Sequence, residues 1–241
     1  STCKELIDAP DSPYQLATVL LFQETKLHGE EEIAAATAFL SSKGFQATFG
    51  PACVSQEGGI SGGVGLAVRA GLDIGVQPLK SAVPADLTHR AVGVLIDAPG
   101  LLSHVLVSMY SVPRIGVQGD NVRLLGWLAS VQDEEKLPVL CGGDFNYEPA
   151  KLHCTDFVSR SGIMAAPPPT ETHFTKSSKR ILDWFLVSEP LSRVISAVSV
   201  QTSAPLAPHR PVRMDIQLSQ ATLVPVLVTS QRLPRRKPYG P

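Results

Sequence analysis

The chain has 241 residues, of which 44% are hydrophobic and 18% are charged. This length suits one large domain or two small ones, and the composition excludes collagen, a coiled coil and intrinsic disorder. The 21 Lys and Arg residues nearly balance the 22 Asp and Glu residues, for a formal net charge of −1. The chain therefore lacks the bulk positive charge of a protein that coats nucleic acid, although a local basic groove remains compatible with this balance.

Apolar runs and alternating patterns predict strands along most of the chain. In chain order they cover residues 17–22, 45–49, 64–69, 74–79, 90–97, 104–109, 138–141, 182–187, 195–201 and 212–218. Helical periodicity predicts helices at 30–42, 120–132 and 150–159, the first of them opened by acids that suit a helix N-terminus. Helices separate only some of the strands, which favours sheets packed on one another with helices outside.

Two segments between these elements are interpreted as turns or loops. The glycine-rich run at 58–65 lacks the Gly-Lys-Ser/Thr ending of a P-loop and leads into a strand instead of a helix, so we interpret it as a flexible turn. Three consecutive prolines within 165–170 predict a rigid surface loop.

The last part of the chain differs in composition from the rest. From residue 220 onward the sequence is turn-rich and then basic, which predicts a Pro-rich basic tail at 220–241 outside one domain at 1–219. An apolar run at 223–228 could add one more strand. The tail contains no acid, so the remainder of the chain is acidic; its basic residues are Arg232, Arg235, Arg236 and Lys237.

Cysteine usage and the start of the chain bear on the compartment. The cysteines show neither Cys-x-x-Cys spacing nor the density of a disulfide scaffold, which predicts reduced, buried thiols and favours an intracellular protein. No apolar run reaches the ~18 residues of a membrane span, and no charged-then-apolar leader opens the chain. The first residue is Ser1 instead of a methionine, which indicates processing or a fragment of a longer protein.

Polar side chains follow the ends of several predicted strands, where a rigid scaffold can hold reactive groups in a cleft. Asp183 is unusual because it interrupts an otherwise apolar strand, where a carboxylate is costly unless it is paired. The candidate functional residues at these strand ends are Glu24, Tyr110, Asp144, Asn146, Asp183 and His209.

Four short motifs around these residues resemble those of the endonuclease/exonuclease/phosphatase superfamily, the DNase I-like metal-dependent phosphodiesterases that include AP endonucleases. They are QETK at 23–26, GGDFN at 142–146, RILDWFLVS at 180–188 and HRPV at 209–212. Each string alone is weak, but four in the family's order argue against chance. The resemblance covers about residues 17–218 and implies an α/β, two-sheet sandwich flanked by helices, the DNase I-like four-layer fold.

Phosphodiester hydrolysis requires neutralisation of the phosphate charge, a deprotonated water for in-line attack and help for the leaving oxygen. Mg²⁺, or Mn²⁺ in its place, supplies the first and uses one or two protein carboxylates, for which Glu24 is the best ligand candidate. The resemblance implies that Asp144 orients or deprotonates the attacking water. It also implies that Asn146 hydrogen-bonds the phosphate or that water.

The resemblance assigns roles to three further candidates. His209 is expected to donate to a phosphoryl oxygen while Asp183 accepts from its other ring nitrogen and sets its tautomer and charge. Tyr110 is expected to place its hydroxyl beside the phosphate. Trp184 alternates with Asp183 in the same strand, so its side chain is predicted to pack in the core instead of stacking on a base.

Other basic residues and histidines lie outside these motifs. The basic residues that could line a groove are Arg69, Arg90, Arg114, Lys176, Arg180 and Arg210. No motif surrounds the remaining histidines, which we interpret as surface or hydrogen-bonded residues; they are His28, His89, His104, His153 and His173.

Two departures from the family pattern concern the metal site. The family opens with a strand that ends in an Asn within a WNxNG pattern, and nothing before Gln15 fits it, so this first strand is predicted to be missing. Where the family has Ser-Asp-His, this chain has Ala207-Pro208-His209, and proline offers neither a carboxylate nor a backbone N–H. A metal site of reduced negative charge and weaker occupancy is the expected result.

The favoured function is therefore an Mg²⁺-dependent phosphodiesterase, an endo- or exonuclease acting on DNA or RNA, with activity impaired by these departures. One alternative is an inactive family member that serves as a nucleic-acid or protein binding module, such as a retroelement-type fragment. The other is a phosphatase or phosphodiesterase acting on small or lipid phosphates. Metal-dependent cleavage of nucleic acid distinguishes the nuclease from the inactive binding module. Hydrolysis of a small phosphate that DNA competitors do not inhibit identifies the phosphatase.

Overall fold

A computed structural model describes residues 5, 7–8, 12–54, 58–98, 100, 102–204 and 207–217. The expected tail at 220–241, the additional strand at 223–228 and Cys3 lie outside these described residues. The described chain contains both helices and several β-sheets, which confirms the mixed α/β class. The ten strands expected between residues 17 and 218 each have a counterpart within a few residues of the predicted bounds.

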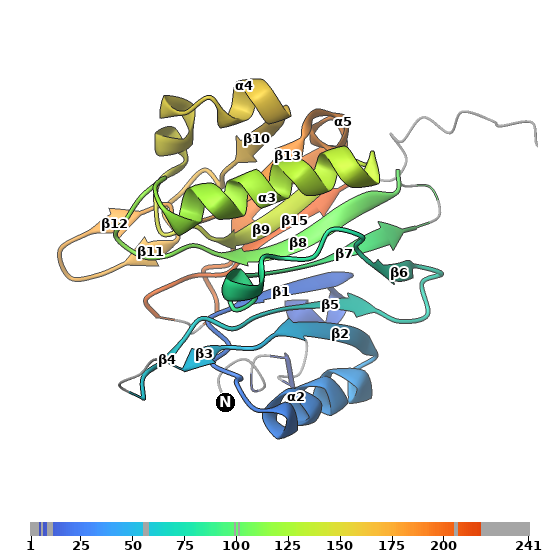
Figure 1. Cartoon of the computed structure of the whole chain (residues 1–241). Helices are drawn as coiled ribbons and strands as arrows, with labels where there is room; N and C mark the ends of the chain where they lie inside the picture. The colour runs from blue at the N-terminus through green and yellow to red at the C-terminus, as the bar shows by residue number, and fades with distance from the viewer. Residues whose placement is uncertain are drawn as a thin grey trace, which may run out of the picture.

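One sheet has three antiparallel strands in the order β1-β5-β2. They are β1 (Val19–Gln23), β5 (Val64–Arg69) and β2 (Phe45–Gly50). Helix α2 (Glu30–Ser42) packs on this sheet, with Leu40 buried against Phe45 and Leu20 (Figure 1). Its first turn carries three glutamates, which complement the partial positive charge of a helix N-terminus.

The second sheet has six strands in the order β10-β13-β9-β8-β7-β6. They are β6 (Gly75–Pro78), β7 (Ala91–Asp97), β8 (His104–Tyr110), β9 (Val139–Asp144), β10 (Ile163–Ala166) and β13 (Asp183–Ser188). Strands β8 and β9 pair in parallel, so the chain between them crosses over the sheet through helix α3 (Asp120–Glu135). The helix packs on one face of the sheet through Leu124, Leu128 and Val131.

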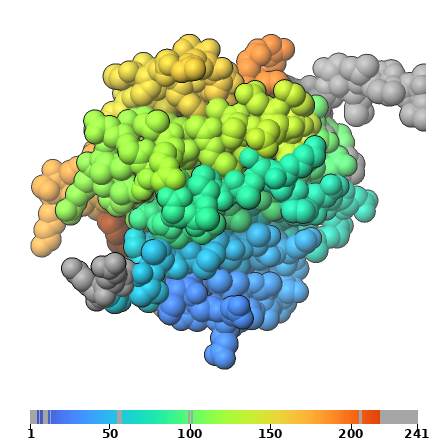
Figure 2. All heavy atoms as spheres, in the orientation of Figure 1, coloured from blue at the N-terminus to red at the C-terminus, as the bar shows by residue number. Residues whose placement is uncertain are grey.

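Side-chain alternation divides the six-stranded sheet into two buried faces. In β8, Val105, Val107 and Met109 pack toward α3, whereas Leu106 joins a cluster with Leu66 of the three-stranded sheet. The layers therefore follow one another as α2, three-stranded sheet, six-stranded sheet and α3 (Figure 1). Figure 2 shows the same succession, from the blue α2 region to the yellow segment that carries α4. Tyr110 falls on the face of β8 that meets the smaller sheet.

Short elements connect and flank the two sheets. They are the 3₁₀ turns Pro13–Leu16, Ala85–Leu87 and Pro149–Cys154, the helices α4 (Phe157–Ser161) and α5 (Glu189–Ser192), and the paired strands β3 (Cys53–Val54) with β4 (Ile60–Ser61), β11 (His173–Phe174) with β12 (Lys179–Arg180), and β14 (Ile195–Val200) with β15 (Val212–Ile216). The two-residue strands leave no periodic pattern, which is why sequence periodicity does not detect them.

Two local predictions are wrong. The helix expected at 150–159 is broken, because Thr155 adopts an extended conformation and its Oγ1 accepts a hydrogen bond from the Phe157 amide. The loop expected to begin at 165 instead starts after β10, because Ala165 and Ala166 pair with β13. In both places a specific hydrogen-bonding partner outweighs the local composition.

The cysteines only partly follow expectation. Cys53, Cys141 and Cys154 are all unpaired, as predicted for reduced thiols, but only Cys141 is buried. Cys53 lies in the exposed two-residue strand β3, and Cys154 ends a 3₁₀ turn that buries only Leu152. Among the helices of the described residues, none combines the length and apolarity needed to cross a membrane.

Candidate catalytic and metal site

Three candidate residues form one row across the six-stranded sheet. Tyr110 pairs with Asp144 across β8 and β9, and Asp144 pairs with Asp183 across β9 and β13. The parallel strands β8 and β9 end here, and the antiparallel β13 begins here, so all three side chains reach the same edge. Gly143 allows β9 to approach β8 closely, because a Cβ there would lie 2.0 Å from the Met109 carbonyl oxygen.

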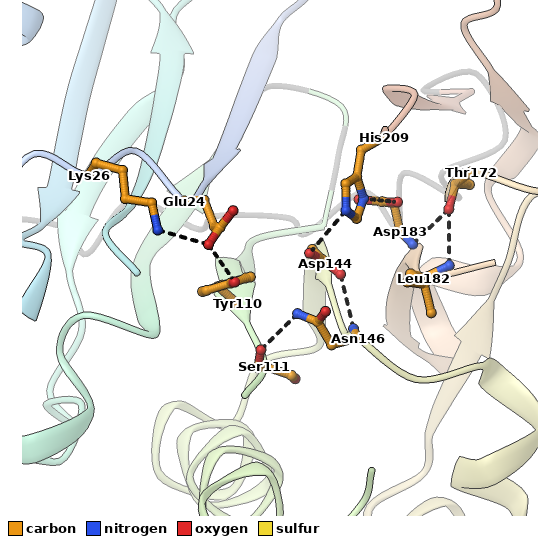
Figure 3. A network of polar contacts seen from close by, with 10 residues as sticks. All are labelled: Glu24, Lys26, Tyr110, Ser111, Asp144, Asn146, Thr172, Leu182, Asp183 and His209. Carbon is orange, nitrogen blue, oxygen red and sulfur yellow. Dashed lines mark hydrogen bonds and ion pairs between the residues drawn. The ribbon is translucent and has the colours of Figure 1, made fainter. Parts of the chain in front are cut away.

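Glu24 reaches the row from the other sheet, directly after β1 (Figure 3). Its Oε1 accepts hydrogen bonds from the Tyr110 hydroxyl at 2.7 Å and from Lys26 Nζ at 2.9 Å, while 48% of the side chain remains exposed. Partial burial alone would raise the pKa of Glu24, but these two hydrogen bonds hold it below its ordinary value. Glu24 is therefore a fixed negative charge at neutral pH.

Asp144 lies in a different electrostatic setting. The residue is 7% exposed, and its Oδ1 accepts a hydrogen bond from the Asn146 amide at 3.0 Å. Burial, followed by the charge of Asp183, raises the pKa of Asp144 to about 7. Burial also raises the pKa of Tyr110, and its hydrogen bond to Glu24 adds to that effect. Asp144 can therefore gain or lose a proton near neutral pH.

Asn146 is tied to the backbone beside Asp144. It has a positive φ of 56°, and its Nδ2 donates to the Ser111 carbonyl oxygen at 2.9 Å. The Ser111 amide in turn donates to the Asp144 carbonyl oxygen at 2.9 Å. These bonds hold Asn146 next to the row, and its contact with a phosphate or a water stays a prediction.

His209 and Asp183 lie together, as the sequence indicates. His209 Nδ1 is 2.9 Å from Asp183 Oδ2 and 3.1 Å from Oδ1. Thr172 Oγ1 accepts from the amides of Leu182 and Asp183 at 3.0 Å each, which fixes the start of β13. Burial by itself lowers the pKa of His209, but the Asp183 hydrogen bond and charge raise it above the ordinary value.

His173 is a neighbour of the site that no sequence motif indicates. Its ring lies edge-on to the His209 ring, with centroids 4.7 Å apart and planes 63° apart. The two residues form an isolated antiparallel bridge, and beside it the Pro208 carbonyl oxygen accepts from the Phe174 amide at 2.9 Å. The contact joins segments distant in sequence, so only the fold reveals it.

The residues around His209 suit a divalent cation. Asp144, Asp183 and His209 can each offer one ligand atom, and these atoms lie within 4.8 Å of one another. Two carboxylates side by side fit a hard cation; burial first and the charge of Asp183 second raise the pKa of Asp144, and such a cation would offset the second of these. Within the described part of the chain, Glu24 stands apart from this group, paired with Lys26.

Three of the other residues considered for a binding role lie in the core or at the edge of a sheet. Trp184 is buried and stacks on Phe145 with ring centroids 4.0 Å apart, which confirms its core role. Arg90 is also buried, with its guanidinium 4.8 Å from the Tyr110 ring centroid. Arg69 bonds the Ala17 carbonyl oxygen at 2.9 Å and so belongs to the sheet edge.

The chain is similar to proteins of one known family. The family model described as the Endonuclease/Exonuclease/phosphatase family matches residues 4–206. A sequence search of curated proteins found no match.

Several solved structures share the fold at low sequence identity. An AP endonuclease from Leishmania major superposes with a TM-score of 0.65 at 16% identity, covering 85% of this chain and 79% of that one. The endonuclease domain of TRAS1, a telomere-specific non-LTR retrotransposon, gives 0.62 at 16% identity, covering 91% and 93%. The 3′ phosphatase NExo from Neisseria, bound to a product DNA hairpin, gives 0.59 at 18% identity, covering 89% and 92%.

Proposed function

The chain belongs to the endonuclease/exonuclease/phosphatase family, and on this basis we propose that it is a metal-dependent phosphodiesterase that hydrolyses nucleic-acid phosphodiester bonds. The observation that carries the proposal is the grouping of Asp144, Asp183 and His209 within 4.8 Å at one sheet edge. Nucleic acid is favoured as the substrate because the similar structures include nucleases and a phosphatase bound to DNA.

Within this proposal the two facing sheets are the sandwich of a DNase I-like four-layer fold. The shared cluster of Leu66, Leu106 and Leu140 supports it. The family's first strand has no counterpart before β1 in the described residues, and we propose a domain at 1–219 with a basic tail at 220–241.

Mg²⁺, with Mn²⁺ as a substitute, is the proposed cofactor, and Glu24 is its proposed carboxylate ligand. When bound, such an ion supplies charge neutralisation on the phosphate and Lewis acidity. The hard carboxylate oxygens of Glu24 suit it, and the carboxyl groups of Asp144 and Asp183 lie together on the facing sheet. Pro208 adds no ligand, so we expect weak occupancy in the absence of substrate.

The protein's own groups supply proton transfer and orientation. Asp144, with a pKa of about 7, is suited to take a proton from the attacking water. His209 is held through Nδ1 by Asp183, which directs Nε2 toward a phosphoryl oxygen as a hydrogen-bond donor. Tyr110 orients Glu24, and Asn146 lies within reach of the water that Asp144 activates.

A basic hairpin beside the site supports a polyanionic substrate. Strands β11 and β12 and the turn between them carry Lys176, Lys179 and Arg180. Arg210 follows His209 and lies over the Phe174 ring at 4.1 Å. Exposed cations of this kind contact phosphates without reading sequence, so the hairpin is the proposed backbone contact.

Nicking of supercoiled plasmid in Mg²⁺ or Mn²⁺ tests the proposal. Asp144→Asn keeps the shape of the side chain but removes the base, and we expect a loss of roughly 100- to 10,000-fold. Asp156→Asn is the matched control, because Asp156 is exposed and paired only with Arg160 in the described structure. A folded wild-type protein that nicks nothing at any metal concentration contradicts the nuclease.

A phosphatase is the second candidate, favoured by the likeness to a 3′ phosphatase. Release of inorganic phosphate from a 3′-phosphorylated oligonucleotide, without internal cleavage, would identify it. If neither reaction occurs while a labelled oligonucleotide still binds in a salt-dependent way, the chain is an inactive binding module.

A further inference from the structure

We propose that the Gly62–Gly63 turn is a positioning element that fixes Glu24 against Tyr110, the neighbour of Asp144 in the row. The proposal rests on the proposed function for its metal-binding readout, whereas its hydrogen-exchange readout needs no substrate or metal. The turn joins β4 to β5, within the glycine-rich run whose composition indicates only flexibility. In the structure it is held on both sides by hydrogen bonds.

The segment that carries Glu24 needs external support. Glu24 and Lys26 have positive φ values of 51° and 59°, a region that residues other than glycine rarely occupy unless their surroundings hold them there. The Thr25 amide donates to the Gly63 carbonyl oxygen at 3.0 Å, and the Lys26 amide donates to the Gly62 carbonyl oxygen at 3.2 Å. The turn thus holds both peptide groups that flank Thr25, the first of which joins it to Glu24.

The opposite side of the turn is attached to the six-stranded sheet. The Gly63 amide donates to the His89 carbonyl oxygen at 2.9 Å, and the next carbonyl along, that of Arg90, accepts from the Tyr110 amide at 2.7 Å. Arg90 Nη2 also donates to Ser61 Oγ at 3.2 Å. A continuous series of hydrogen bonds therefore leads from the Glu24 segment to Tyr110.

Both positions require glycine for two reasons. Their φ values are 74° and 82°, and no side chain fits at either place. A Cβ on Gly63 would lie 2.4 Å from Thr25 Oγ1, and a Cβ on Gly62 would lie 2.6 Å from the His89 carbonyl oxygen. A side chain at position 63 would therefore displace the backbone segment that carries Glu24.

Such a displacement acts on the site through one bond. The Tyr110 hydroxyl reaches Glu24 Oε1 at 2.7 Å, and a hydrogen bond weakens steeply when it is stretched or misaligned. Loss of that bond separates the carboxylate of the three-stranded sheet from the row on the six-stranded sheet. The turn is therefore a positioning element and makes no contact with the reacting atoms.

Gly63→Ala tests the proposal, with Gly71→Ala as a matched control. Gly71 has nearly the same φ, 80°, but no atom lies within 4 Å of a Cβ placed there, so it reproduces the backbone strain without the collision. Hydrogen exchange of the Thr25 and Lys26 amides in metal-free protein is the structural readout. We expect at least about tenfold faster exchange in Gly63→Ala and no change at these amides in Gly71→Ala.

Mn²⁺ titration supplies the second readout, for which we expect about 10- to 100-fold weaker binding in Gly63→Ala. Adding Thr25→Ala removes the oxygen that the new methyl group meets and should restore much of both properties. If Gly63→Ala does not fold alone, Gly62→Ala, whose Cβ would meet the His89 carbonyl oxygen at 2.6 Å, carries the same comparison.

Unchanged exchange in Gly63→Ala, or equal effects in Gly71→Ala, overturns the proposal. If the amides respond but wild-type protein neither binds Mn²⁺ nor cleaves, the proposed function fails and the positioning role stands.

Discussion

The Glu24 segment on the three-stranded sheet and the Asp144–Asp183–His209 group on the six-stranded sheet hold negative charge in opposite ways. Glu24 is half exposed and hydrogen-bonded by Lys26 and Tyr110, which lowers its pKa. Asp144 is buried next to Asp183, which raises its pKa to about 7. The first region supplies a permanent charge suited to a cation, and the second supplies a proton acceptor whose ionisation is sensitive to its surroundings.

Breaking the Asp183–His209 pair on the six-stranded sheet should have a large effect. Asp183→Asn removes the carboxylate that raises the pKa of His209, so the imidazolium loses its proton at lower pH. We expect roughly 100-fold lower activity and a basic limb of the pH–rate profile displaced toward acid. A uniform loss of rate with an unchanged profile would contradict this role for Asp183.

Pro208→Asp adds a carboxylate next to His209. The six-stranded sheet would then also contribute a permanent negative charge for a cation, as Glu24 does on the three-stranded sheet. We expect metal affinity and nicking to rise by about 10- to 100-fold, measured by Mn²⁺ titration and by the plasmid assay. Pro208→Ala, which removes the ring without adding a charge, is the control. Equal activity in the two variants would show that the missing carboxylate does not limit the reaction.

The raised pKa of Asp144 also predicts a pH-dependent stability. Its pKa is about 7 in the folded chain against 3.8 ordinarily, so between these values the unfolded state loses its proton while the folded state keeps it. The free energy of unfolding therefore falls as pH rises from 4 to 7.

Asp144→Asn should remove this contribution, making the protein more stable by about 1–3 kcal/mol at pH 8 and nearly unchanged at pH 4. Urea unfolding at the two pH values measures it. If Asp144→Asn is instead less stable than the wild-type protein at pH 8, ionisation of Asp144 does not destabilise the folded state.

The smallest expected effect concerns the Glu24 segment. Lys26→Met removes an exposed ion pair, which should raise the pKa of Glu24 and free its carboxylate from a competing cation. Exposed pairs contribute about 0.2–1 kcal/mol, so Mn²⁺ affinity should increase no more than about fivefold. Lys43→Met, which also removes an exposed ion pair, controls for net charge. An equal increase in Mn²⁺ affinity there would contradict a specific role for Lys26.

The sequence predicted those features that leave a local pattern. Strand runs and the helices at 30–42 and 120–132 were found because their apolar residues repeat with the period of the element. The pairing of Asp183 with His209 was also expected, because a carboxylate inside an apolar strand needs a partner and the motif order supplied one.

Features that depend on distant segments were not predictable. His173 meets His209 through an isolated bridge, and Gly62 and Gly63 hold Glu24 through hydrogen bonds across two sheets. Neither arrangement leaves a spacing in the sequence. The same glycines that composition marks as flexible are, in the folded chain, fixed by their neighbours.

The hydrogen bond between Tyr110 and Glu24 joins residues 86 positions apart, and it forms only where the two sheets meet. Contacts between residues so far apart in sequence are slow to form, because the chain loses the entropy of closing a long loop before the contact contributes any stabilisation. The site should therefore be assembled among the last events of folding. Recovery of activity after denaturant dilution would then lag behind recovery of secondary structure, and a partly folded chain would carry all of these residues without catalysing the reaction.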